Sequence, residues 1–273
     1  MSQLKLFIES RHRVSGSSED FAYQLPRGFD LPPSEAFLDD IAIPNVFYTI
    51  TSRNNKLYLR ELVSSFPVVV YSYRILTLDN GQYNAISLAD EVTDKMNAGL
   101  ANVIYKATYD TSTAKLSIST LAGEFAFFGE QALPGQWNTE QAANPISGDV
   151  NSANRVVGFY NMAVGTGVVG TALQAPDIVD LASHSRCLYI HSDLGLPEQS
   201  FGPRGDSGCV RKVLIDAPQN DLIIDRHTST WGAINLDEQP LRSIRFSLRD
   251  DEGRLVDLQG HNWSFSLYIS ERV

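Results

Sequence analysis

The sequence lacks the features that define several large classes of protein. No stretch of its 273 residues approaches the roughly eighteen consecutive apolar residues of a membrane-spanning helix. The net charge of −10 at pH 7 argues against a general affinity for nucleic acid, which favours a basic face. Basic residues are scattered, apart from a small group at Arg11, His12 and Arg13. We therefore expect neither a membrane span nor a specific nucleic-acid partner.

Cysteine and histidine are also scarce. The two cysteines, Cys187 and Cys209, are too few for a disulfide framework or a cysteine-based metal site. The five histidines show no i, i+4 spacing on a helix, and none lies at zinc-ligand spacing from a cysteine. The first residues lack the apolar core and small-residue cleavage site of a secretion signal. We expect reduced cysteines in a protein made in the cytosol, with no metal and no cofactor.

Short runs rich in β-branched and aromatic residues are abundant, separated by Gly, Pro, Asn and Asp. In 244–248 and 263–267 every second side chain is apolar, as a half-buried antiparallel strand requires. Strands are predicted at 20–25, 41–50, 56–62, 68–78, 103–109, 115–120, 187–191, 209–215, 243–249 and 263–269. The pattern predicts an all-β protein.

Only one segment, 87–100, has the sequence pattern of a stable helix. Ser87 would cap it, with Asp90 completing a capping box. Leu88 and Met96 then fall on one apolar face. Parallel α/β layering would need helices between most strands, and they are missing.

Residues 201–210, FGPRGDSGCV, carry two functional motifs within what also reads as a polar turn between strands. The letters GDSG at 205–208 copy the sequence around the nucleophile of trypsin-like proteases. Such an enzyme needs a histidine beside the serine, supplied from a distant part of the chain. Here His184 and His191 lie close upstream of Ser207, and Cys209 replaces the glycine that follows the motif. We expect no catalytic residues in this segment.

The second motif is the cell-adhesion tripeptide Arg204, Gly205 and Asp206. Its recognition requires a turn that holds a guanidinium and a carboxylate apart at an exposed tip, with glycine allowing the bend. Glycine and proline on either side favour such a turn. These three residues are candidate binding residues, and the interpretation as an ordinary polar turn stays open beside them.

A glycine-rich motif, GTGVVG, lies at 165–170. A dinucleotide fingerprint of this form needs a helix directly after it, whose N-terminus binds the pyrophosphate. The following segment reaches Pro176 too soon for such a helix. A loop of small residues is the better interpretation, and no base–nucleophile pair appears elsewhere in the chain, so we expect no enzyme.

Several stretches, each weak alone, follow one another in a distinctive order. They are FIESRHR at 7–13, DF at 20–21, IAIPN at 41–45, NGQY at 80–83, VGF at 157–159, APD at 175–177, LYIHSDL at 188–194, VRKV at 210–213 and the closing segments 244–248, 250–253 and 263–267. In this order the sequence resembles the penton, or minor capsid, proteins of the Polinton (Maverick), virophage and polinton-like virus group. The segment 122–155 takes no part in the resemblance.

The resemblance implies a jelly-roll β-sandwich that assembles as a homopentamer at the five-fold vertices of an icosahedral capsid, beside the major capsid protein. Residues 1–78 and 181–273 would form one composite domain. Residues 79–180 would be an insertion with the helix, a β-hairpin and a loop-rich segment. The protein would be made in the host cytoplasm and reside in the virion, and an exposed adhesion loop would add a host receptor as a partner.

The alternative is a β-sandwich module that binds a carbohydrate or a receptor and works without a capsid. It would carry a shallow pocket of aromatic and carboxylate side chains, or use the exposed loop at 204–206. Such a module would be a stable monomer or trimer, whereas the penton interpretation predicts a ring of five.

Overall fold

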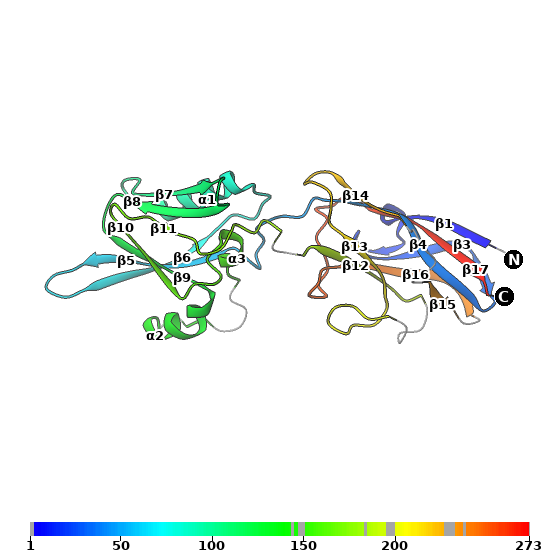
Figure 1. The fold of residues 1–273 in the computed structure, drawn as a ribbon. Coiled ribbons are helices and arrows are strands. Elements are labelled where there is room, and N and C mark those ends of the chain that lie inside the picture. The colour runs from blue at the N-terminus through cyan, green and yellow to red at the C-terminus, as the bar shows by residue number, and fades with distance from the viewer. Residues whose placement is uncertain are drawn as a thin grey trace. The chain divides into compact units, whose positions relative to one another are not determined.

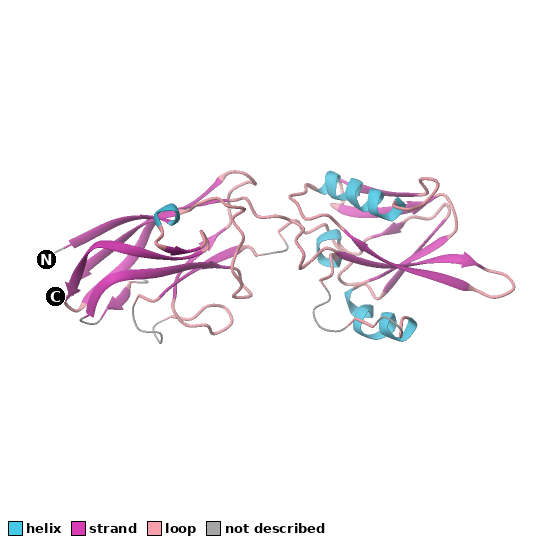
Figure 2. Cartoon of the chain, turned by 180° about the vertical axis from the view of Figure 1, so that it is seen from behind, coloured by secondary structure: helices cyan, strands magenta, loops and turns pink. Residues whose placement is uncertain are grey.

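The computed structural model describes residues 3–142, 145–146, 151–182, 185–194, 200–226, 233–236 and 239–272. The chain forms two compact units (Figure 1). The first combines residues 1–47 with 184–273, and the second is the segment 48–183 inserted between them. Strands dominate both units and helices are few (Figure 2). Within the described part of the chain, no helix has the length and apolar character needed to cross a membrane.

The first unit is a sandwich of two antiparallel sheets. The first sheet has the order β1 (Gln3–Glu9), β17 (Ser264–Glu271), β4 (Ser34–Pro44) and β14 (Leu222–Asp225), with β15 (Ile234–Leu236) also paired to β4. The second has the order β13 (Cys209–Leu214), β12 (Cys187–Ser192), β16 (Gln239–Arg249), β3 (Asp20–Leu31) and β2 (Ser15–Gly16). A short 3-10 turn, η1 (Ser10–His12), links β1 to β2. Early and late strands are direct neighbours in both sheets, and the predicted all-β jelly-roll sandwich is confirmed.

Aromatic side chains hold the centre of this sandwich. Trp263, just before β17, contacts Phe21 of β3 with ring centroids 5.8 Å apart, and Phe265 at 4.9 Å. The buried indole Nε1 donates to the main-chain oxygen of Ser18 at 2.8 Å. The main-chain nitrogen of Trp263 donates to the hydroxyl of Ser10 at 3.1 Å. A buried indole stabilises a core when its N–H finds a partner, so these contacts tie the end of the chain to its beginning.

The second unit contains two further antiparallel sheets and a helix of 13 residues. The four-stranded sheet has the order β10 (Val164–Val168), β9 (Glu124–Phe128), β5 (Lys56–Ser64) and β6 (Val70–Thr77). The three-stranded sheet has the order β11 (Leu173–Gln174), β8 (Lys115–Thr120) and β7 (Tyr105–Asp110). The helices are α1 (Ala85–Asn97) and the short segments η2 (Glu130–Ala132), η3 (Leu133–Trp137), α2 (Asn138–Glu140) and α3 (Asn154–Val157). Buried side chains of α1 and both sheets share one core.

Helix α1 has the predicted buried face but a different start. Leu88 and Met96 are buried, as their spacing predicted. The cap, however, is Asn84 rather than Ser87. The Asn84 side-chain oxygen accepts from the main-chain nitrogens of Ile86 at 3.0 Å and Ser87 at 2.9 Å, and the Ser87 hydroxyl accepts from the main-chain nitrogen of Asn84. This capping box starts the helix two residues earlier than the sequence suggested.

The inserted unit also begins earlier than expected. The sequence predicts a composite domain of residues 1–78 and 181–273, whereas the structure divides the two units between Phe47 and Tyr48. Strands β5 and β6 therefore belong to the insertion. Strand β5 belongs to the insertion because it pairs with β9, where Leu59 lies opposite Phe127. Phe127 lies in the segment 122–155, which takes no part in the resemblance described above. Alternating polarity predicts a strand but does not identify its neighbour.

Close packing at Gly129 gives a test of the inserted unit. A Cβ atom there would lie 2.0 Å from the main-chain oxygen of Met162, so the backbone itself would have to move. We expect Gly129→Ala to lower the free energy of unfolding by about 1–3 kcal/mol in a urea titration. Gly135→Ala is the matched control, since no atom beyond its chain neighbours and its own helical turn lies within 4 Å of its Cβ position. Equal effects of the two substitutions would contradict this packing.

Candidate functional site

The segment with the two motifs forms a tight turn in the first unit, between β12 and β13. The main-chain nitrogen of Gly202 donates to the oxygen of Asp206 at 2.7 Å, and that of Gly205 to the oxygen of Gly202 at 3.0 Å. Phe201 and Ser207 form a bridge across the base. Gly205 has a φ of 82°, a left-handed conformation that glycine adopts without strain. The segment is therefore a well-bonded polar turn.

The carboxylate of Asp206 is turned into the protein. Its Oδ2 lies 3.0 Å from Nε2 of His191 on β12, and both carboxylate oxygens are buried. Gly202 leaves room for them, because a Cβ there would lie 2.6 Å from each oxygen. Arg204 is exposed, and its Nη1 donates to the main-chain oxygen of Glu252 at 3.3 Å. Of the adhesion tripeptide, the guanidinium is at the surface and the carboxylate is not.

His191 contacts the turn through both ring nitrogens. Nδ1 lies 3.2 Å from the main-chain oxygen of Ser207, while Nε2 faces Asp206. Burial lowers the pKa of His191 below its ordinary value of 6.5, and the nearby Arg249 acts in the same direction. The oxygen of Ser207 and the carboxylate of Asp206 oppose that shift in pKa. Because the histidine contacts the main-chain oxygen of Ser207 and not its hydroxyl, it holds the turn and does not form a nucleophile–base pair. His184, the other candidate base, lies outside the described residues.

The glycine-rich motif at 165–170 serves packing. It forms most of β10 and the turn after it, and a strand, β11, follows where a dinucleotide site needs a helix. A Cβ on Gly167 would lie 2.4 Å from the ring of Phe125, and one on Gly165 would lie 2.3 Å from the sulfur of Met162. The sequence predicts a loop here, whereas the structure has a strand whose small residues let it lie flat against an aromatic core.

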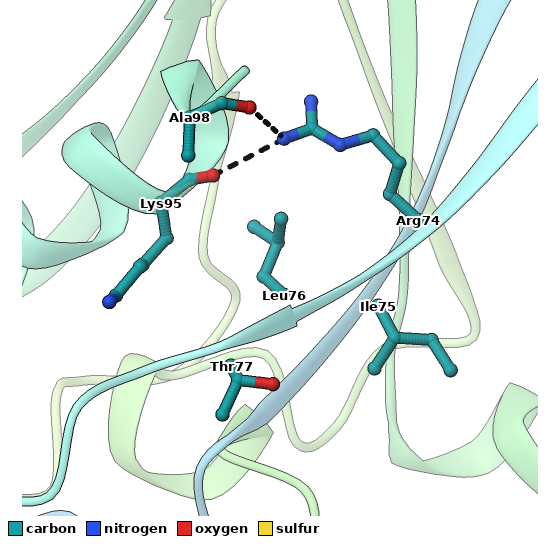
Figure 3. Close-up of a pocket in the computed structure, with 6 residues that line it drawn as sticks. All are labelled: Arg74, Ile75, Leu76, Thr77, Lys95 and Ala98. Carbon is teal, nitrogen blue, oxygen red and sulfur yellow. Dashed lines mark hydrogen bonds between the residues drawn. The ribbon is translucent and has the colours of Figure 1, made fainter.

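A hollow of about 290 Å³ lies between β6 and the end of α1 (Figure 3). Arg74 reaches across it and donates to the main-chain oxygens of Lys95 at 3.3 Å and Ala98 at 3.2 Å. It also pairs with Glu61 at 2.9 Å. The ammonium of Lys95 pairs with Asp79 at 2.7 Å. Both cations of the hollow are thus engaged by the chain, and Arg74 caps the carboxyl end of a helix where a positive charge is favourable.

The two lateral edges of the sandwich carry exposed apolar side chains. On one edge β13 and β14 lie side by side, joined by an ion pair between Arg211 and Asp225 at 2.7 Å. We call the exposed residues of this edge the β13–β14 flank: Leu214, Leu222 and Ile224. On the other edge, β1 and β2 are the outer strands. We call its exposed residues the β1–β2 flank: Phe7 and Val14.

The flanks also differ in charge. The exposed basic group Arg11, His12 and Arg13 follows β1, and Arg11 pairs with Glu9. Exposed acidic residues border the other edge, namely Asp216 and Asp221. Strand register places both groups at the same end of the strands. In the first sheet, the paired residues that lie side by side across the strands include Glu9, Ser264, Ala42 and Ile224. The basic group follows Glu9 on one edge, and Asp221 lies just before Ile224 on the other. Opposite charges therefore lie at matching heights on opposite edges.

The basic group at 11–13 is evident in the sequence, whereas the apolar flanks are not predicted above. A signal for them was present, because Val213 and Leu214 are adjacent, as are Ile223 and Ile224. Neighbouring residues of a strand face opposite sides, so in each pair one apolar side chain must point outward. The structure buries Val213 and Ile223 and exposes their neighbours. Among the described residues, no cluster of His, Cys, Asp and Glu is arranged to hold a metal ion.

No protein-family model matches the chain, and no curated protein matches it. Among solved structures, the crystal structure of the mavirus penton protein is similar over 100% of both chains, with a TM-score of 0.54 and 9% sequence identity. The resemblance suggested by the sequence is confirmed at the level of the fold. The match includes the inserted unit as well as the sandwich.

The buried His191 should make stability depend on pH. Because its pKa is lowered on folding, the unfolded chain binds more protons below about pH 6.5, and the free energy of unfolding should fall as the pH drops from 7 to 5. The substitution His191→Gln removes the titrating group, so its urea unfolding should depend less steeply on pH over this range. Identical pH dependence of the two proteins would contradict a buried, titrating His191.

Proposed function

We propose that this chain is a structural protein of a viral capsid, a penton protein whose homopentamers close the five-fold vertices beside the major capsid protein. The observation that carries the proposal is the match to the mavirus penton protein along the full length of both chains. A jelly roll alone occurs in many unrelated proteins. A sandwich interrupted by a second, β-rich unit is a more specific arrangement, and the match covers both parts.

A ring requires each subunit to present two different, complementary surfaces. The β13–β14 flank and the β1–β2 flank meet this requirement, because both expose apolar side chains and they lie at opposite edges of the sandwich. The basic group at 11–13 and the acidic residues Asp216 and Asp221 would then approach each other across the contact. We assign the ring interface to these two flanks, with charge fixing their register and apolar burial supplying most of the affinity.

In this role the protein is made in the host cytoplasm and resides in the virion, and its work is assembly, not catalysis. Residues 204–206 receive no receptor-binding role, because the carboxylate oxygens of Asp206 are buried inside the turn, with Oδ2 3.0 Å from Nε2 of His191. An exposed carboxylate is what the adhesion interpretation needs. The alternative of a free-standing binding module has no comparable observation in its favour.

The mass of the assembly tests the proposal directly. Light scattering and native mass spectrometry of the full chain should give a species of about five times the subunit mass of 30.2 kDa, alone or after mixing with the major capsid protein. Electron microscopy of that species should show a closed ring. A monomer under both conditions would overturn the capsid proposal.

Substitutions on the two flanks test the interface. Ile224→Asp and Phe7→Asp should each abolish the ring, because each places a charge in an apolar contact. A mixture of the two variants retains one intact pair of flanks, so it should form heterodimers and nothing larger. Leu255→Asp alters an exposed apolar residue outside both flanks and should leave the ring intact. Rings formed by either flank variant, or a mixture that stays monomeric, would refute this interface.

A further inference from the structure

The β5–β6 hairpin projects from the body of the inserted unit (Figure 1). Its strands pair from Lys56 and Thr77 at the base to Ser64 and Val70 near the end. We call residues 63–70 the hairpin tip. Phe66 there is 85% exposed, the largest exposed fraction among the exposed large apolar side chains of the described residues. The other exposed apolar side chains of the tip are Val63, Val68, Val69 and Val70.

The tip belongs to a segment without charge. Residues 62–73, LVSSFPVVVYSY, contain no acidic or basic side chain. The charges that flank this segment are paired within the unit, since Glu61 pairs with Arg74 at 2.9 Å and Arg60 with Glu140 at 2.8 Å. In a chain with a net charge of −10, an uncharged projection that ends in a phenylalanine is costly to leave in water unless something covers it.

Apolar side chains are exposed on both faces of the hairpin and at its end. Val69 and Val70 are consecutive, so in an extended chain they face opposite sides, and both are exposed. A protein groove covers one face of a strand pair, whereas an apolar solvent surrounds all of it. At the turn, the Ser64 hydroxyl donates to the main-chain oxygen of Phe66 at 2.9 Å. This bond lowers the cost of removing that oxygen from water.

Two tyrosines, Tyr71 and Tyr73, lie on β6 next to the hairpin tip. The ring of Tyr71 lies under the guanidinium of Arg60 at 4.4 Å, and the hydroxyl of Tyr73 donates to Glu140 at 2.7 Å. At the rise of an extended strand, Tyr73 follows Val70, the first residue of β6, by roughly 10 Å. That length matches the depth to which apolar side chains enter the boundary of headgroups and acyl chains. Tyrosine is enriched at that boundary, where an apolar ring and a polar hydroxyl are both accommodated.

The geometry points to the hairpin tip as a membrane-docking element that inserts Phe66 and the neighbouring valines into the interface of a lipid bilayer with uncharged, zwitterionic headgroups. Anionic lipid is disfavoured, because the chain is acidic and the two cations nearest the tip, Arg60 and Arg74, are paired with carboxylates. This inference does not rest on the capsid proposal. A ring of five tips would strengthen weak single contacts through multivalency.

Flotation with vesicles of phosphatidylcholine tests the inference. The full chain should float with the vesicles, and replacing a third of the lipid by phosphatidylserine should reduce the bound fraction. The double substitution F66S/V69S should weaken binding on the order of tenfold or more, because it removes the burial of a phenylalanine and a valine. The control I86S/I178S alters two exposed apolar residues of the same unit away from the hairpin and should float like the original chain.

The outcomes separate lipid from protein as the occupant. Wild-type protein that stays at the bottom of the gradient overturns the inference, as does an equal loss of binding in both double variants. A fall in oligomeric mass of F66S/V69S without any lipid also overturns it, because the tip would then be a contact between copies of the chain. Thermal unfolding checks that the variants are folded, and Phe66→Gln provides a second, milder substitution at the tip. Since ring assembly is measured separately on the flanks, failure of this inference leaves the capsid proposal standing.

Discussion

Pairing between the two ends of the chain is the constraint on which the rest of the structure depends. Strand β17 lies between β1 and β4, so the last strand is completed on both sides by the first residues of the protein. Trp263 fixes the same junction through its bonds to Ser10 and Ser18. Because β17 and β4 fill the centre of the first sheet, β1 and β14 lie at its two edges, where the flanks are found. The motif-bearing turn is held in the same way, since β12 and β13 extend the sheet that β3 and β16 begin.

Three short motifs looked functional in the sequence, and each has a local physical explanation. The glycines at 165 and 167 let a strand approach Met162 and Phe125. Gly202 makes space for the side chain of Asp206, and the ring of His191 contacts the turn at Asp206. A motif of three to six letters specifies residue types, but the chemistry of adhesion or nucleotide binding depends on where the side chains and helix ends point. Here the glycines and Asp206 contribute to holding a turn and a core.

Much of the fold could be read from periodicity. Alternation in 244–248 and 263–267 predicted two strands of the sandwich core, and the spacing of Leu88 and Met96 predicted the buried face of α1. The start of that helix was misplaced because Asn84 and Ser87 offer equally good capping patterns in sequence. The extent of the insertion was underestimated because β5 pairs with a strand beyond the helix and hairpin that separate them. The inward direction of Asp206, and which of Ile223 and Ile224 is exposed, depend on tertiary packing, which local patterns do not encode.

The interrupted sandwich also sets an order of events during synthesis. Ribosomes release the first four strands of the sandwich long before β12 to β17 exist, so β1 and β4 must wait without the strand that separates them. The inserted unit is complete in sequence once residue 183 has been made, and its core contains nothing from the later segment. The middle of this polypeptide is therefore ready to fold before either of its ends. The nascent amino-terminal strands, with their unpaired edges, are the part most in need of protection from aggregation until translation ends.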